Sequence, residues 1–354
     1  MRIILIDDEA NFGWYEVVSK ALFANEEIEC AIDILSATEK LSTEEYDLIL
    51  LDLRFGESDH DNSEIENFGG YTILRNFIRN SFFSLNFPTP VILFTASNKA
   101  WHIFDMIDSG VDDFYVKEHP DLTDLEFSRK NYLRLLSSII SLKALGNKRR
   151  EIWKSILDIS VVCEVAIANN NIRNRIIEKL KIGYGLLFRK TTSLENKELL
   201  FNNEIIAFIV FWSILEEISH DFFSRREETD IEWILRKNGK QLQWRYNDNT
   251  IKTLFSTIKD EVNTESVSSI SVQSHHISLS SQIAAILRYQ KNWNHHKIHL
   301  SFLSKLNKFR NDIDFIHSDT QSILNNSLSK HYDSLVGYEK CTQILTFINE
   351  ILLS

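Results

Sequence analysis

The stretch Leu48-Ile49-Leu50-Leu51-Asp52 decides the fold of the first third of this chain. Its apolar residues are consecutive and end directly at a carboxylate, without the alternation of a strand that has one face in water. Such a continuous run is typical of a strand buried on both faces, as in a parallel sheet that is covered by helices. We therefore expect an inner strand over residues 48–51 with Asp52 at its carboxyl end.

Three other segments before residue 120 repeat this pattern of an apolar run that ends at polar residues. In open parallel sheets the carboxyl ends of the strands form the edge where ligands bind, so these polar groups should meet there. Clustered carboxylates repel one another unless a hard cation neutralises them, and Mg²⁺ prefers oxygen ligands. A carboxylate beside such a cation can attack phosphorus in line, while a lysine ammonium stabilises the transferring oxygens. The segments are Ile3–Ile6 before Asp7 and Asp8, Val91–Phe94 before Thr95, and Phe114–Val116 before Lys117.

This arrangement resembles the response-regulator receiver family over about residues 1–125. The matching motifs are Ile6-Asp7-Asp8-Glu9, Leu50-Leu51-Asp52, Phe94-Thr95-Ala96 and the run from Gly110 to Lys117. The resemblance implies a doubly wound α/β fold with five parallel strands, and a sensor histidine kinase or phosphotransfer protein as partner. It also implies a hydroxyl–aromatic pair that moves on phosphorylation. By this resemblance the phosphoacceptor is Asp52, the Mg²⁺ ligands are Asp7, Asp8, Asp52 and the backbone carbonyl of Arg54, the phosphoryl-binding residue is Lys117, and the moving pair is Thr95 and Phe114.

Two features depart from the receiver pattern. Glu118 follows the lysine where the family usually has proline, and an acidic insertion occupies residues 56–67. The insertion could alter partner choice or the lifetime of the phosphoryl group, but it removes no site residue. The alternative interpretation is a receiver that is never phosphorylated and serves only as a docking surface.

The charge of the chain is unevenly distributed. Residues 1–150 hold 15 Lys and Arg against 26 Asp and Glu, whereas residues 151–354 hold 24 of each, so the net charge of −11 lies in the first part. This lacks the broad basic field of a duplex-DNA binder. The longest apolar run, Ile205–Leu215, is too short to span a membrane, and three scattered cysteines fit reduced thiols. We therefore expect a cytoplasmic protein with no membrane segment and no duplex-DNA partner.

After residue 150 the sequence predicts a mainly α-helical bundle domain with a short β-hairpin. Glycine and proline are scarce, with 10 and 3 residues in the whole chain. Two strand-like segments flank Asn238-Gly239, a strong signal for a type I′ turn. Glu217 and His220 have the spacing of di-iron bundles, but no second copy exists, which favours polar contacts on a helix face. The expected domains are a receiver over residues 1–125, a connecting helix over 126–150 and a helical effector over 151–354.

Near the chain end, the apolar spacing over residues 306–317 predicts a helix with Arg310 and His317 on one face and Asp314 between them. Arg310-Asn311 followed by this histidine resembles the motif of the HEPN family of all-helical domains, over about residues 200–354. Many members are metal-independent ribonucleases. An imidazole can move the proton of an RNA 2′-hydroxyl, and a guanidinium can stabilise the phosphorane, leaving a 2′,3′-cyclic phosphate. The resemblance implies a site of Arg310, Asn311, Asp314 and His317 composed by a homodimer.

The sequence thus predicts a two-component response regulator that controls RNA cleavage, in stress response or phage defence. Besides the kinase, the expected partners are RNA and a second copy of the chain. Two alternatives stay open. The helical part could be a non-enzymatic interaction module that phosphorylation gates, with an Arg310–Asp314 ion pair on a surface helix and a neutral His317. It could also be a regulator that binds nucleic acid without cleaving it, which the neutral net charge of residues 151–354 disfavours.

Overall fold

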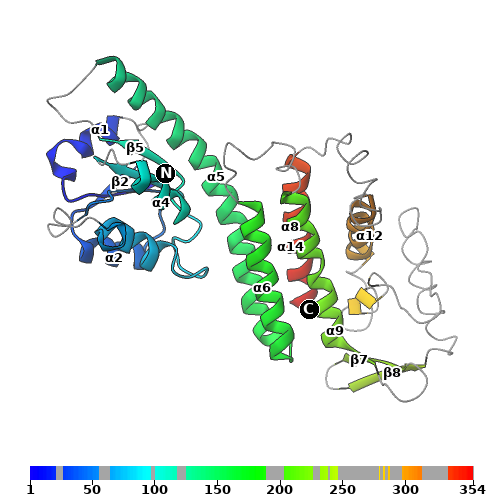
Figure 1. The fold of residues 1–354 in the computed structure, drawn as a ribbon. Coiled ribbons are helices and arrows are strands. Elements are labelled where there is room, and N and C mark those ends of the chain that lie inside the picture. Colours follow the sequence, from blue (N-terminus) through cyan, green and yellow to red (C-terminus); the bar gives the residue numbers. More distant parts are fainter. Residues whose placement is uncertain are drawn as a thin grey trace. The chain divides into compact units, whose positions relative to one another are not determined.

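A computed structural model of the chain divides into two compact units, Met1–Trp153 and Lys154–Ser354. Figure 1 shows their secondary structure, and each unit is described by itself. Among the described residues, no helix combines the length and the apolar character needed to cross a membrane. The structure describes residues 1–20, 27–55, 64–96, 100–117, 125–188, 203–225, 232–237, 240–245, 279, 282–283, 286–287, 297–312 and 334–353.

The first unit is built on a parallel sheet of five strands in the order β2-β1-β3-β4-β5. The side chains of β3 are all buried, as a continuous apolar run predicts for an inner strand. Ile6 pairs with Ala31 on one side and with Leu51 on the other, so β1, β2 and β3 end level with one another. The strands are β1 (Arg2–Ile6), β2 (Glu27–Ala31), β3 (Leu48–Leu51), β4 (Val91–Thr95) and β5 (Asp113–Val116).

Helices cover both faces of this sheet, which confirms the doubly wound α/β fold. Ile3 and Leu5 belong to one hydrophobic core, with α1 (Trp14–Lys20) and α5 (Leu125–Ala166). Ile4 and Ile6 belong to the opposite core, which the remaining helices close. The alternation follows from the pleat of a strand, which sends successive side chains to opposite faces. The helices of the second core are α2 (Ile34–Thr43), α3 (Gly69–Ile73), which continues in a π-helical turn η4 (Leu74–Ile78), and α4 (Ala100–Asp108).

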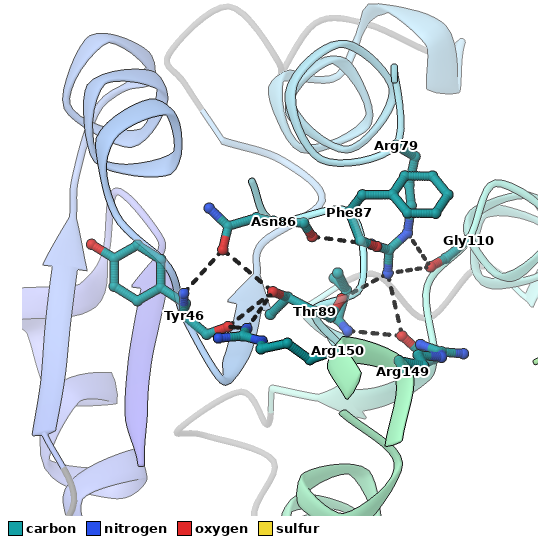
Figure 2. Close-up of polar contacts among 10 residues, drawn as sticks. Tyr46, Arg79, Asn86, Phe87, Thr89, Gly110, Arg149 and Arg150 are labelled. Carbon is teal, nitrogen blue, oxygen red and sulfur yellow. Dashed lines mark hydrogen bonds and ion pairs between the residues drawn. The ribbon is translucent and has the colours of Figure 1, made fainter. Parts of the chain in front are cut away.

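A polar network at the amino ends of β4 and β5 ties α5 to the sheet (Figure 2). At its centre is Asp112, whose side chain is only 2% exposed. Its carboxylate accepts the backbone N–H of Val91 at 2.9 Å and forms ion pairs with Arg149 at 2.8 Å and Arg79 at 3.4 Å. Arg79 comes from the turn after η4 and also donates to the carbonyl oxygens of Phe87 and other loop residues. A buried carboxylate is thus matched by two guanidinium groups.

The next arginine extends the network to the start of β3. Arg150 donates to the backbone carbonyl of Tyr46 and, at 3.2 Å, to the hydroxyl of Thr89 (Figure 2). One turn later, the indole N–H of Trp153 donates to the carbonyl oxygen of Phe82 at 2.6 Å. The sequence predicted a helix that stops at the charged residues 147–150. In the structure α5 continues through them to Ala166, and the side chains of Arg149 and Arg150 bind groups of the first unit.

The second unit is mainly helical, as the sequence predicted. α8 contacts both α6 and α14 along its length (Figure 1). The apolar stretch from Asn203 to Phe222 forms two helices, α8 and α9, which are divided at Ser213, and the chain then enters the strand β6. β7 and β8 form the predicted antiparallel hairpin, with Lys237 paired to Lys240, and β6 adds a third strand. The elements are α6 (Asn170–Leu187), α8 (Asn203–Trp212), α9 (Ile214–Phe222), α12 (Lys297–Asp312), α14 (Ser334–Leu352), β6 (Phe223–Arg225), β7 (Glu232–Lys237) and β8 (Lys240–Arg245).

Two contacts define the packing of α6 in this bundle. Gly183 lies against the ring of Phe211, where an added Cβ would come within 2.2 Å of the Cε1 atom. Glu217 of α9 accepts hydrogen bonds from Arg175 at 2.8 Å and Lys179 at 2.7 Å. The carboxylate therefore serves a polar contact between two helices, in line with the expectation of polar contacts on this helix.

Candidate acidic site at the carboxyl edge of the sheet

Three aspartates gather where β1 and β3 end. Oxygen atoms of Asp7, Asp8 and Asp52 lie within 4.8 Å of one another. The backbone ladder carries on past the strands and holds two of them, because the N–H of Asp52 donates to Ile6 at 2.9 Å and that of Asp7 donates to Ala31 at 3.0 Å. Asp7 and Asp52 are buried, and Asp8 is half-buried. The carboxylates are thus placed by the ends of inner strands and not by loop geometry.

A lysine from the end of β5 completes the cluster. The ammonium of Lys117 lies 2.7 Å from Asp52 Oδ2 and 2.6 Å from Asp7 Oδ2. Its backbone N–H donates to the carbonyl of Thr95 at 2.7 Å, so β4 positions the residue. Lys117 is only 4% exposed. Side chains that are 65 residues apart in the sequence, Lys117 and Asp52, are therefore in direct contact.

Burial governs the protonation of this cluster. It raises the pKa of Asp52 to about 7, against the opposing ammonium of Lys117 and with a further upward contribution from the carboxylate of Asp7. Burial is also the main reason why the pKa of Asp7 is raised. For Lys117, burial would lower the pKa, but the carboxylates of Asp52 and Asp7 outweigh it and raise the pKa. Three carboxylates facing one ammonium are a set of hard oxygen donors with excess negative charge, which fits Mg²⁺.

The remaining residues predicted for this site lie on the neighbouring segments. Thr95 is fully buried at the end of β4, and Phe114 is half-buried in β5, where it pairs with Leu93. The guanidinium of Arg134 on α5 lies 4.1 Å from the centroid of the Phe114 ring. Arg54 follows Asp52 by two residues, and its guanidinium lies over the ring of a phenylalanine at 4.9 Å. Its role as a carbonyl ligand of Mg²⁺ stays a prediction.

One residue in contact with the segment around Asp52 was missed as a site residue at the sequence level. Gly70 is the second residue of α3, and its N–H donates to the carbonyl of Leu53, just after β3, at 3.1 Å. A Cβ on Gly70 would lie 2.0 Å from the carbonyl oxygen of Asp52. The Gly69-Gly70 pair was the available signal, since paired glycines often mark a close approach of two backbones.

The second predicted site is described only in part. Arg310 lies half-buried in the last turn of α12, and Asn311 follows it in the helix, whereas Asp314 and His317 lie outside the described residues. The apolar face of this helix packs inward as expected, with the ring of Phe309 at 5.0 Å from that of Phe208. The proposed pairing of the arginine with the histidine therefore rests on the sequence.

The order β2-β1-β3-β4-β5, with helices on both faces and acids at the carboxyl edge, is the doubly wound order of CheY-like proteins. The first unit has the fold of a receiver domain. No family model matches the chain, and neither does any curated protein.

Solved structures of receiver domains are similar to this part of the chain. A receiver domain from Methanospirillum hungatei is 16% identical, and the match covers 39% of this chain and 94% of that protein, with a TM-score of 0.28. A Francisella receiver domain is 19% identical and covers 41% and 96%, with a TM-score of 0.29. The response regulator domain of Thermotoga maritima CheB is 23% identical and covers 41% and 96%, with a TM-score of 0.30.

Proposed function

We propose that this chain is a two-component response regulator whose receiver accepts a phosphoryl group on Asp52. The observation that carries the proposal is the cluster itself, in which the carboxylates of Asp7, Asp8 and Asp52 lie together and the ammonium of Lys117 lies 2.7 Å from Asp52. Buried acids elsewhere serve structural ion pairs, but three carboxylates that face one ammonium are an oxygen-rich set that a bound divalent cation can neutralise. The donor is a phosphohistidine of a sensor kinase or phosphotransfer protein.

In the transfer step, a carboxylate oxygen of Asp52 forms a bond to phosphorus, and the P–N bond of the phosphohistidine breaks with its electron pair going to the imidazole. Lys117 then binds an oxygen of the phosphoryl group. Asp7, Asp8, Asp52 and the carbonyl of Arg54 would hold Mg²⁺, which would supply positive charge to stabilise the phosphoryl oxygens.

The response to phosphorylation begins at the next strand. The hydroxyl of Thr95 turns to bond a phosphoryl oxygen, and Phe114 turns into the space that it leaves. This movement takes the Phe114 ring away from the guanidinium of Arg134, which now lies over it at 4.1 Å. Since Arg134 belongs to α5, the change at Asp52 reaches the helix that leads out of the receiver.

For the output we retain the proposed division into a receiver (residues 1–125), a connecting helix (126–150) and a helical effector (151–354). The effector is proposed to cleave RNA without a metal, with His317 as acid or base and Arg310 as the group that binds the phosphate. The support is the sequence motif together with the inward packing of the apolar face of α12. The second candidate is an interaction module without enzyme activity.

The receiver proposal is tested by incubating the full chain with Mg²⁺ and acetyl phosphate and following the intact mass. We expect the gain of one phosphoryl group in the wild type and none in Asp52→Asn. A wild-type protein that stays unmodified, with both a small donor and phosphorylated kinases, contradicts the proposal.

The output is tested with total RNA, added in excess chelator after the phosphorylation step. RNA cleavage that is lost in Arg310→Ala and His317→Ala, but retained in Lys308→Ala, supports the nuclease. Lys308→Ala is the matched control, because Lys308 is exposed and its substitution removes one positive charge from the same helix. RNA that stays intact in every phosphorylation state contradicts the nuclease and favours the interaction module.

A further inference from the structure

Two aromatic rings from different elements lie beside the lysine of the acidic site. The centroids of the Trp14 and Phe94 rings each lie 5.6 Å from the ammonium nitrogen of Lys117. The two rings touch edge to face, with centroids 5.4 Å apart and planes at 86°. Phe94 also stacks on Tyr115 at 4.9 Å. The rings are therefore fixed by one another and by the core of the sheet face that carries α1 and α5.

The ammonium has little access to water, since the side chain of Lys117 is 2% exposed. On one side it contacts the carboxylates of Asp7 and Asp52. The rings of Trp14 and Phe94 lie next to each other beside the ammonium. The negative face of an aromatic ring attracts a cation, most strongly where water is excluded. The rings also occupy space from which water would otherwise compete for the ammonium.

We propose that Trp14 and Phe94 form an aromatic pocket that positions Lys117 for the phosphoryl group. The inference rests on the proposed phosphorylation of Asp52 and names two positioning residues for that reaction. When Asp52 gains a phosphoryl group, the ammonium has to leave the carboxylate and meet new oxygens. A lysine whose ammonium lies against two rings keeps its place during this exchange, whereas a solvated ammonium loses the orientation that the transfer requires.

Trp14 is the better probe of this pocket, because it is half-buried whereas Phe94 is fully buried in the core. The variant Trp14→Leu removes the ring, and Trp14→Phe keeps one. Tyr15→Leu is the matched control, since it removes an aromatic residue that is 40% exposed at the next position of α1. If Trp14→Leu does not fold, Trp14→Met replaces it as a flexible apolar residue without a ring.

Three quantities are measured on the full chain: the rate of phosphorylation by acetyl phosphate, the affinity for beryllofluoride at saturating Mg²⁺, and the affinity for Mg²⁺ alone. We expect Trp14→Leu to lower the first two about tenfold, the size of a desolvated cation–π contact. The Mg²⁺ affinity should stay within about twofold, because the carboxylates remain, and Trp14→Phe should recover most of the loss.

The inference is overturned if Trp14→Leu behaves like the wild type, or if Trp14→Leu and Trp14→Phe are equally impaired. It is also overturned if Mg²⁺ affinity falls in parallel with the phosphorylation rate, since that indicates a structural role for the ring. Failure of the underlying function has a different signature. In that case the wild type and Tyr15→Leu also take no phosphoryl group, and both proposals fall together.

Discussion

The close approach of Gly70 to the end of β3 predicts that Gly70→Ala damages both the stability and the phosphorylation of the first unit. The added Cβ would lie 2.0 Å from the Asp52 carbonyl oxygen and 2.8 Å from that of Leu53. Ordinary contacts of a Cβ begin at 3.4 Å, so the separation from the Asp52 oxygen must grow by at least 1.4 Å. Both neighbours are backbone atoms of the segment directly after β3, and a backbone oxygen cannot rotate away as the end of a flexible side chain can.

Two effects follow from a displacement of this size. Overpacking of a closely packed core typically costs 1–3 kcal/mol, and with two backbone contacts we expect a loss of about 3 kcal/mol in the free energy of unfolding. The displacement also moves the segment that carries the Asp52 carboxylate. A misplacement of about 1 Å can slow a positioned reaction a hundredfold, so the phosphorylation rate should fall at least tenfold.

Stability is measured by hydrogen exchange of peptides from β1, β3 and β4 in the full chain, because two units make a single unfolding midpoint ambiguous. The rate is measured with acetyl phosphate and Mg²⁺. Gly185→Ala is the control, since no atom lies within 4 Å of its Cβ position in helix α6. It should stabilise α6 by up to about 1 kcal/mol and leave phosphorylation unchanged.

The reasoning is refuted if hydrogen exchange gives Gly70→Ala a free energy of unfolding within about 0.5 kcal/mol of the wild type and the variant is phosphorylated at the same rate. A loss of stability without a loss of rate would refute the second step alone. In that case α3 moves and the strand end does not.

Three further predictions concern contacts within single units. Asp112→Ala leaves Arg79 and Arg149 without their buried carboxylate, so hydrogen exchange of β4 and β5 should show a loss of about 3 kcal/mol in the free energy of unfolding. An unchanged value would mean that water already satisfies both guanidinium groups. Burial alone would raise the pKa of Glu217, but the hydrogen bonds from its two basic partners on α6 outweigh it and lower the pKa below the ordinary 4.5. Its stabilisation is therefore complete above pH 4.5 and is lost as pH falls through the lower folded value, so thermal unfolding of Glu217→Gln should lack this acid-side loss in the second unit. Gly183→Ala should lower the stability of the second unit by about 2 kcal/mol in hydrogen exchange of α6 and α8, unless the Phe211 ring can turn aside.

Four of the five strands were predictable because their pattern is local. The apolar runs at 3–6, 48–51, 91–94 and 114–116 match the observed strands to within a residue at each end. β2 was not found from its residues, although the family resemblance implied a fifth strand. It lies at the edge of the sheet, and its residues Glu27–Ala31 alternate polar and apolar side chains with partial exposure. An edge strand of this kind lacks the continuous run on which the other assignments rested.

The division of the helical part shows the same contrast. Asn238-Gly239 predicted the hairpin because a two-residue turn demands these residue types, and β7 pairs with β8 across it. The division of one apolar stretch into α8 and α9 at Ser213 had no comparable signal. The residues on both sides are good helix formers, and the division depends on what each helix packs against.

The local sequence pattern was thus enough to predict the parallel sheet, the cluster of Asp7, Asp8, Asp52 and Lys117 at one edge, and a helical second part. The reason is that the burial of a strand and the place where it ends determine the types of its consecutive residues. Tertiary structure alone decided which distant groups complete these features. Arg150 contacts Glu45, 105 positions away in the sequence, and Trp14 and Gly70 reach the acidic site from separate helices. The physical reason is that a contact between two faces depends on how whole elements pack, and a residue's near neighbours in sequence carry no record of that packing.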